Sequence, residues 1–312
     1  MKKSLLLLGV AVAAITSCTN DEVLDINKNT TIGFESFVNK GTRAVTQTTN
    51  ADIAKIYVYG SYGDTDVFSN VEVTKGGTGW TYENPVAWTA NNYKFAAYAT
   101  ANTSSKLTSN ISYDKANGSL TFSDYVPTNA NDLVAAVTSV NNTGLANETV
   151  NLTFKHLLAK LQFAFTNDAD NDTYKMEISD IKFSVLPQGD CVFNGTPAWT
   201  AEGSATEMTI AGGADIAKAA VWTSEDQIVV PNQDLATVKA AFTVTFKDAS
   251  NNIVYTKGYN NVSLSLDGAG SKWQPGFNYI YTASISSTTE YIKFNVSSVE
   301  GWADKNTGVT LP

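Results

Sequence analysis

Few residues of this chain could carry out chemistry, and they do not cluster along the sequence. His156 is the single histidine among 312 residues, which excludes a metal site with two imidazole ligands and a proton relay between two histidines. It lies in the apolar run "FKHLLAKLQFAF", where a structural role fits better than a catalytic one. The motifs G-x-S-x-G, H-E-x-x-H and G-x-x-x-x-G-K-[ST] are absent. We therefore predict that the protein is not an enzyme and has no catalytic residues.

One acidic segment has the spacing of a calcium loop. Asp168, Asp170 and Asp172 alternate in "NDADNDTY", as hard oxygen ligands do on one side of a Ca²⁺-binding turn. The sixth loop position is Thr173 instead of glycine, and the twelfth is Ser179 instead of glutamate. A solvated hairpin tip accounts for the three aspartates at least as well, so we expect no metal and no cofactor.

Cys18 is expected to carry lipid. Two lysines precede the apolar run Leu5–Ile15, which is shorter than the roughly 20 residues that cross a bilayer and indicates a signal peptide over residues 1–17. The run ends in "ITSC", which resembles the lipobox of bacterial lipoproteins, whose cysteine is acylated with chains such as palmitate. Two or more acyl chains give stable anchoring in a membrane. The alternative is an ordinary secretory signal with an incidental cysteine.

The elements that must position these residues are predicted to be β-strands. Only 16% of the residues are charged, and the chain is rich in Thr, Asn, Ser, Val and Tyr, which favour strands and polar turns. Short alternating apolar segments are separated by Gly, Asn, Asp and Pro clusters. If Cys18 carries lipid, Cys191 in "GDCVFNG" has no disulfide partner and is expected to be a buried, inert thiol. We expect an all-β protein whose stability comes from apolar cores.

The chain is long enough for two domains. Between its halves lies "SVNNTGLANET", residues 139–149, which is poor in large apolar residues and reads as a linker. We expect β-sandwich domains over residues 44–140 and 150–312. The net charge of −9 argues against a nucleic-acid partner, because phosphates bind basic surfaces.

Arg43 is the only arginine, while the other basic residues are all lysine. By itself a lone arginine indicates a solvated surface charge. However, the ordered series "SCTNDEVLDINKNTTIGFESFVNKGTRA", "IAKIYVYGSY", "YKFAAYAT", "VNLTFKHLLAKLQFAF", "KWQPGFNYIYTASI" and "IKFNVSSVEGW" resembles the fimbrillin family of pilin subunits and their accessory proteins.

This resemblance implies a lipoprotein precursor with two tandem transthyretin-like β-sandwich domains. It also implies transport to the cell outer membrane and maturation there by an arginine-specific protease. Arg43 followed by Ala44 matches the family's cleavage position, so residues 18–43 would form a propeptide.

The propeptide contains a segment that could be a removable strand. In "TIGFESFV", Ile32, Phe34 and Val38 lie on one face of an extended chain, so they could fill an apolar groove. Cleavage after Arg43 would let this strand leave. The groove left behind would present apolar surface and unpaired backbone groups to a strand from another molecule.

A candidate donor strand lies at the other end of the chain. In "YIKFNVSSV", Ile292, Phe294 and Val296 share one face, and the I-x-F spacing repeats that of Ile32 and Phe34. We expect either that residues 291–312 are donated to a neighbouring subunit or that they complete their own domain.

Taken together, these features indicate a structural subunit of cell-surface fimbriae that supports adhesion. Its expected partners are other fimbrial subunits, the protease, and the outer membrane through lipid before cleavage. The alternative is a surface lipoprotein that stays anchored through Cys18 and binds a glycan or a host protein without polymerising.

Overall fold

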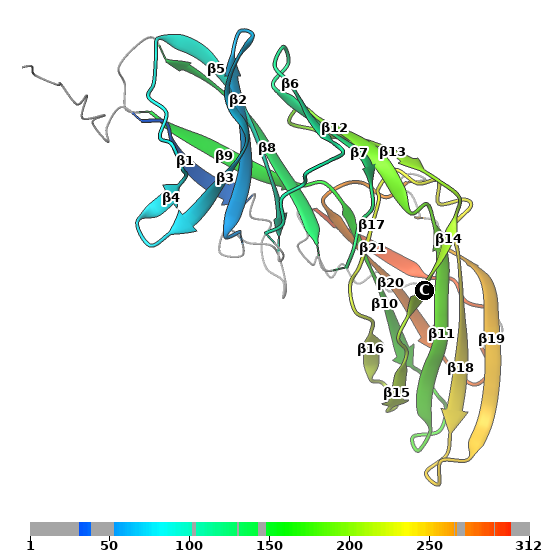
Figure 1. Ribbon diagram of the computed structural model, residues 1–312. Helices are drawn as coiled ribbons and strands as arrows, with labels where there is room; N and C mark the ends of the chain where they lie inside the picture. Colours follow the sequence, from blue (N-terminus) through cyan, green and yellow to red (C-terminus); the bar gives the residue numbers. More distant parts are fainter. Residues whose placement is uncertain are drawn as a thin grey trace, which may run out of the picture.

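The computed structural model describes residues 31–38, 53–101, 104–129, 131–142, 148–264, 266, 272–289 and 291–300. In these ranges the chain forms β-strands arranged in several sheets (Figure 1), which confirms the all-β prediction. None of the described residues belongs to a helix that could span a membrane.

A seven-stranded sheet occupies the N-terminal part of the molecule. Its order is β1-β9-β8-β5-β2-β3-β4, and β1 at its edge runs parallel to β9. The strands are β1 (Gly33–Val38), β2 (Lys55–Tyr62), β3 (Thr65–Gly76), β4 (Gly79–Thr81), β5 (Asn91–Ala101), β8 (Asp132–Asn142) and β9 (Thr149–His156).

A four-stranded sheet covers one face of this seven-stranded sheet. Its order is β13-β12-β7-β6, and its strands are β6 (Ile111–Asp114), β7 (Ser119–Tyr125), β12 (Gln188–Phe193) and β13 (Pro197–Glu202). Both sheets contribute to one buried cluster that includes Tyr98, Phe122 and Trp199. We call these two sheets the first sandwich.

The central strands of the seven-stranded sheet are buried on both faces, because successive side chains point to opposite sides of a strand. On β2, Ile56 and Val58 belong to one apolar cluster, whereas Tyr57 and Tyr59 belong to the cluster under the four-stranded sheet. The near-continuous apolar run of β2 therefore contributes side chains to two separate apolar clusters, one on each face of the sheet.

The second sandwich consists of two five-stranded sheets. In one, β16-β10-β20-β21 are neighbours and β17 also pairs with β10; in the other, β14-β11-β18-β19 are neighbours and β15 also pairs with β11. The strands are β10 (Ala159–Asn167), β11 (Lys175–Val185), β14 (Thr206–Ile210), β15 (Gly213–Ile216), β16 (Val221–Thr223), β17 (Gln227–Val229), β18 (Lys239–Lys247), β19 (Ile253–Ser263), β20 (Phe277–Ile285) and β21 (Asn295–Glu300).

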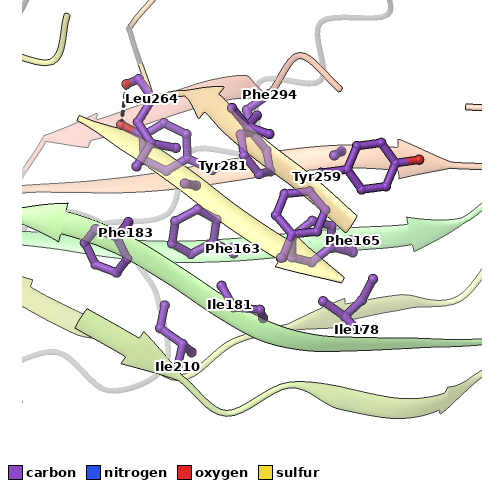
Figure 2. Packing of buried hydrophobic residues seen from close by; sticks show 14 of the residues in the cluster. Phe163, Phe165, Ile178, Ile181, Phe183, Ile210, Tyr259, Leu264, Tyr281 and Phe294 are labelled. Atoms are coloured by element: carbon purple, nitrogen blue, oxygen red, sulfur yellow. Dashed lines mark hydrogen bonds between the residues drawn. The ribbon is translucent and has the colours of Figure 1, made fainter. Parts of the chain in front are cut away.

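Aromatic side chains from both sheets fill the second sandwich. Figure 2 shows Phe163 and Phe165 of β10 beside Tyr281 of β20 and Phe294, with Phe183 and Ile178 of β11 on the other side of the core. The Tyr281 hydroxyl, buried in this core, donates a hydrogen bond to the Leu264 carbonyl oxygen. Burial of this polar group is therefore compensated.

Strand pairing does not follow the contiguous halves expected from the sequence. β9 begins at Thr149, the last residue of the expected linker at residues 139–149, yet it pairs with β1 and β8. Likewise, β12 pairs with β7. The chain passes from the first to the second sandwich at Leu157 and Leu158, both fully buried. The turn-forming residues that suggested a linker lie in the connection between β8 and β9, which returns the chain to the same sheet. Glu148 in this connection is exposed. The division into domains at residues 140 and 150 does not describe these sheets.

Candidate assembly site

The strand β1 is an integral part of the first sandwich. It pairs with β9 over six consecutive positions, from Gly33 opposite Thr149 to Val38 opposite Phe154. Ile32, Phe34 and Ser36 are only 1%, 4% and 2% exposed, whereas Glu35 is exposed. The alternation predicted from the sequence is therefore present, with Ile32 and Phe34 facing the core.

Phe34 is held by a group of aromatic side chains. Its ring makes edge contacts with Phe68 of β3, Tyr82 after β4, and Phe95 of β5, at centroid distances of 5.4, 5.7 and 6.0 Å. Such pairs each add about 0.5–1.5 kcal/mol beyond the burial of apolar area. Phe34 therefore links β1 to strands that are distant in the sheet.

The other side of β1 contacts the connection between β4 and β5. The Ile32 amide donates to the Val86 carbonyl oxygen at 2.8 Å, and the Tyr82 hydroxyl donates to the Ile32 carbonyl oxygen at 2.8 Å. Thr31 forms an isolated bridge with Ala87. The start of β1 therefore lies between β9 and the β4–β5 connection.

Loss of β1 would have two physical consequences at this edge. The backbone groups of β9 that pair with β1 would lose their partners, and Val150, Leu152 and Phe154, now fully buried, would lose apolar cover. Unpaired backbone beside exposed apolar surface is a template for another strand. The β1 position is thus a potential strand-acceptor groove.

Several predicted site residues cannot be placed in this geometry. Cys18, Arg43 and Ala44 lie outside the described residues, and so does most of the expected propeptide. The backbone of Val38 is the last position of β1, paired with Phe154.

The C-terminal segment completes its own sandwich in this structure. β21 pairs antiparallel with β20, with Val296 opposite Tyr281. Phe294 is 3% exposed and its ring lies 5.6 Å from that of Phe163 and 5.8 Å from that of Tyr281. Ile292 and Val296 are partly buried against the same cluster. The three candidate donor residues therefore share the core-facing side of the segment, as their spacing predicted.

The aspartates of the calcium-like segment have a cationic side chain as partner. The Lys218 ammonium forms an ion pair with Asp172 Oδ1 at 2.5 Å and donates to the Asp170 carbonyl oxygen at 3.4 Å. The hydrogen bond from Lys218 lowers the pKa of Asp172 below its usual range. Because the Asp172 carboxylate is already paired with an ammonium group, it is not free to act as a calcium ligand together with Asp168 and Asp170.

The histidine and the second cysteine have structural surroundings. His156 Nδ1 lies 2.6 Å from Asp132 Oδ2, and both side chains are buried at the end of β9 and the start of β8. Cys191 is fully buried, and burial raises the pKa of its thiol to about 12. Such a thiol is almost entirely protonated near neutral pH and is a poor nucleophile.

The sequence alone did not identify the walls of the β1 position. Phe68, Tyr82 and Phe95 come from three separate segments, and only the sheet order brings them to Phe34. Tyr82 lies directly after β4, which ends at Thr81. The proline at position 85 was a signal that pairing stops there, because proline donates no backbone hydrogen bond.

The fold and this site define a class of all-β proteins built from sandwiched sheets, with a buried strand at one sheet edge. A comparison with curated proteins finds no match to the chain. Among solved structures, a fimbrial protein from Bacteroides vulgatus matches with a TM-score of 0.61 and 18% identity, over 88% of this chain and 100% of that one. A putative cell adhesion protein from Bacteroides uniformis matches with a TM-score of 0.52 and 18% identity, over 88% and 99% of the two chains. At these identities the likeness concerns the fold.

A sequence model of the fimbrillin-like family matches residues 42–302. The chain belongs to the fimbrillin-like family. As a member of this family it is a structural protein and not an enzyme, which agrees with the prediction from the sequence.

Proposed function

We propose that the protein is a structural subunit of cell-surface fimbriae and polymerises by exchange of its edge strand. It would be exported as a lipoprotein acylated at Cys18, cleaved after Arg43, and assembled when a strand from a neighbouring subunit replaces β1. The observation that carries the proposal is the position of β1. It is a buried edge strand that the only arginine of the chain separates from the body of the protein.

Membership of the fimbrillin-like family supports the fimbrial role, and one structural neighbour is described as a fimbrial protein. The lone arginine supports a single cut, because an arginine-specific protease finds no second site in the chain. Fimbriae lie at the cell surface, which is the location we assign to the assembled protein.

The C-terminal segment is our candidate for the incoming strand. If β21 leaves β20, the second sandwich loses Phe294 from its core, a cost of about 3–5 kcal/mol by analogy with Phe→Ala substitutions. Contacts of Phe294 in the position of Phe34 would offset that loss in the neighbour. The net gain would then come from covering β9 and the aromatic walls of the open groove.

One position of the groove limits the match between the two strands. With Phe294 in the place of Phe34, Ile292 and Val296 would occupy the positions of Ile32 and Ser36. Ile292 would take the position of Ile32 if the incoming strand runs in the direction of β1, and that of Ser36 if it runs in the opposite direction. Ser36 is 2% exposed, so an isoleucine or valine there needs space that serine does not fill. Exchange therefore requires relaxation around Ser36, in the part of the groove beside Leu152.

A peptide competition experiment tests the strand-acceptor groove. A synthetic peptide with the sequence of residues 31–38 is added to the full chain together with an arginine-specific protease. We expect the peptide to reoccupy the groove and to stop polymerisation, as measured by electron microscopy and sedimentation. The matched control replaces the peptide phenylalanine that corresponds to Phe34 with alanine and should compete much less. Equal polymerisation with and without the first peptide would argue against the groove.

Deletion of residues 291–312 tests the donor. We expect the shortened chain to stay folded in both sandwiches and to accept a strand, but to donate none, so it should cap fibres of the intact protein. If the shortened chain polymerised by itself as well as the intact chain, another segment would have to be the donor.

A further inference from the structure

A groove in the first sandwich adjoins the β1 position, with which it shares Phe68, Tyr82 and Val86, but it opens along a different strand. It runs along β3, which among the described strands pairs with β2 along most of its length but with β4 only from Thr74 to Gly76. The opposite wall is the chain after β4, from Tyr82 to Val86. Two adjoining hollows of about 560 and 390 Å³ form the groove, within the size range of small-molecule sites.

Apolar and polar residues line the groove together. Val71 and Tyr82 line both hollows, as do the carboxylates Glu72 and Glu83. Further hydrogen-bonding side chains on the rim are Ser69, Thr74, Thr81, Asn84 and Lys106. Such a surface can contact both the C–H groups and the hydroxyl groups of one ligand.

Glu72 is held in a fixed orientation. Its Oε1 accepts an ion-paired hydrogen bond from Lys55 at 2.7 Å, and the Thr74 hydroxyl donates to the same oxygen at 3.4 Å. The hydrogen bond from Lys55 lowers the pKa of Glu72 below its usual range. Glu72 is thus an ionised hydrogen-bond acceptor that does not have to be ordered when a ligand binds.

The charges around the groove are balanced. Glu72 and Glu83 are accompanied by Lys55, which pairs with Glu72, and by Lys106 on the rim. A balanced groove gives no advantage to a strongly charged ligand. It favours a neutral ligand with many hydrogen-bond donors and acceptors.

Addition of a peptide strand to β3 is disfavoured. The register of β3 against β2 shifts twice, between Val58 and Gly60 and between Gly60 and Ser61, and Asn70 has a left-handed φ of 53°. Such bulges interrupt the regular ladder that an added strand needs. The opposite wall contains Pro85, which has no amide hydrogen to offer.

We propose that this groove binds a neutral oligosaccharide. Carboxylates Glu72 and Glu83 would accept hydrogen bonds from sugar hydroxyl groups, Asn84 and Lys106 would donate to sugar oxygens, and Val71 with Tyr82 would contact the apolar face of a sugar ring. Each subunit carries one such groove, so a fibre would present many copies and gain avidity. Only that gain rests on the proposed polymerisation, because the groove is complete in the single, uncleaved chain.

The test uses the full, unpolymerised chain on an array of neutral and acidic oligosaccharides, followed by calorimetric titration with the tightest neutral one. We expect Glu83→Gln and Asn84→Ala each to weaken binding about tenfold, as expected for loss of one hydrogen bond in a ligand site. The matched control is Glu207→Gln, which changes an exposed glutamate of β14 paired with Lys182 and should leave the affinity unchanged. Circular dichroism of each variant checks the fold.

Three outcomes would overturn the proposal: no neutral oligosaccharide on the array is bound, binding is unchanged in both groove variants, or the groove binds extended peptides in preference to sugars. Because uncleaved chain is used, failure of polymerisation would not produce any of these outcomes. Conversely, loss of sugar binding would leave the strand-exchange proposal intact.

Discussion

Phe34 is the side chain that couples β1 most directly to the rest of the first sandwich. Replacement by alanine removes its three ring contacts, and we expect a loss of about 3–5 kcal/mol in the free energy of unfolding of the uncleaved protein. Glu35→Ala, on the exposed face of the same strand, is the control and should change stability by less than about 0.5 kcal/mol. Urea titration measures both. Equal effects of the two substitutions would mean that Phe34 does not anchor β1.

Cys191 offers a second test at the residue scale. Burial raises the pKa of its thiol to about 12. We therefore expect the folded Cys18→Ser protein not to react with a thiol reagent at pH 8. The comparison is the time in which the urea-unfolded protein reacts completely. Rapid reaction of the folded protein would show that the thiol is accessible and that the surrounding core opens.

For single residues, the sequence predicted on which face of a strand a side chain lies, but not which side chains it contacts. Alternation in "TIGFESFV" was sufficient to place Ile32 and Phe34 on one face, because successive strand residues point to opposite sides. The partners of Phe34 lie on β3, β5 and the β4–β5 connection, and no local pattern determines which strands become neighbours. The ion pair between Asp172 and Lys218 could not be predicted either, because the two residues are distant in the sequence.

Among the elements, β21 completes the second sandwich and is also the proposed donor strand. Phe294→Ala should destabilise the second sandwich by about 3–5 kcal/mol, because four aromatic rings contact Phe294. Lys293→Ala, on the exposed face, should have little effect. Thermal unfolding measures both variants, and the polymerisation assay then shows whether Phe294→Ala also weakens strand donation. A stability loss below about 1 kcal/mol for Phe294→Ala would contradict the packing in Figure 2.

The connections between the sandwiches show why element boundaries were harder to predict than element types. Most strands were recognised from alternating apolar segments, but "VNLTFKHLLAKLQFAF" was one continuous segment in the sequence and forms β9 and β10 in two different sandwiches. The crossing residues Leu157 and Leu158 are buried, so they carry no turn signal. Pairing of β12 with β7 is a long-range property that composition does not encode.

At the scale of the whole molecule, the chain crosses repeatedly between the sandwiches, at residues 157–158, 186–187 and 203–205. The crossings are tied by side chains, since Trp199 Nε1 donates to the Leu157 carbonyl oxygen and Asn232 Nδ2 donates to the Trp199 carbonyl oxygen at 2.6 Å. We therefore expect both sandwiches to unfold in one cooperative transition, with equal exchange protection of the slowest amides in β5 and β18. Two separated calorimetric transitions would show that the sandwiches unfold independently.

Alkaline pH should destabilise the molecule as a whole. Burial raises the pKa of Cys191 and of Tyr98, Tyr125 and Tyr281 above their ordinary values of 9.0 and 10.0. The unfolded chain then releases these protons at lower pH than the folded chain, so the free energy of unfolding falls as the pH rises above about 9. Urea titrations at pH 8 and pH 11 measure the difference. Unchanged stability between the two would mean that these groups are not buried.

The central claim is that β1 occupies its groove only until the chain is cut after Arg43. It is tested most directly by determining the N-terminal residue of subunits in purified surface fibres, in the wild type and in Arg43→Ala. The account predicts wild-type fibres whose subunits begin at Ala44 and lack residues 31–38, and a folded Arg43→Ala chain that forms no fibres. Fibres built from chains that retain β1, or a surface protein that begins at lipidated Cys18 and never polymerises, would contradict it.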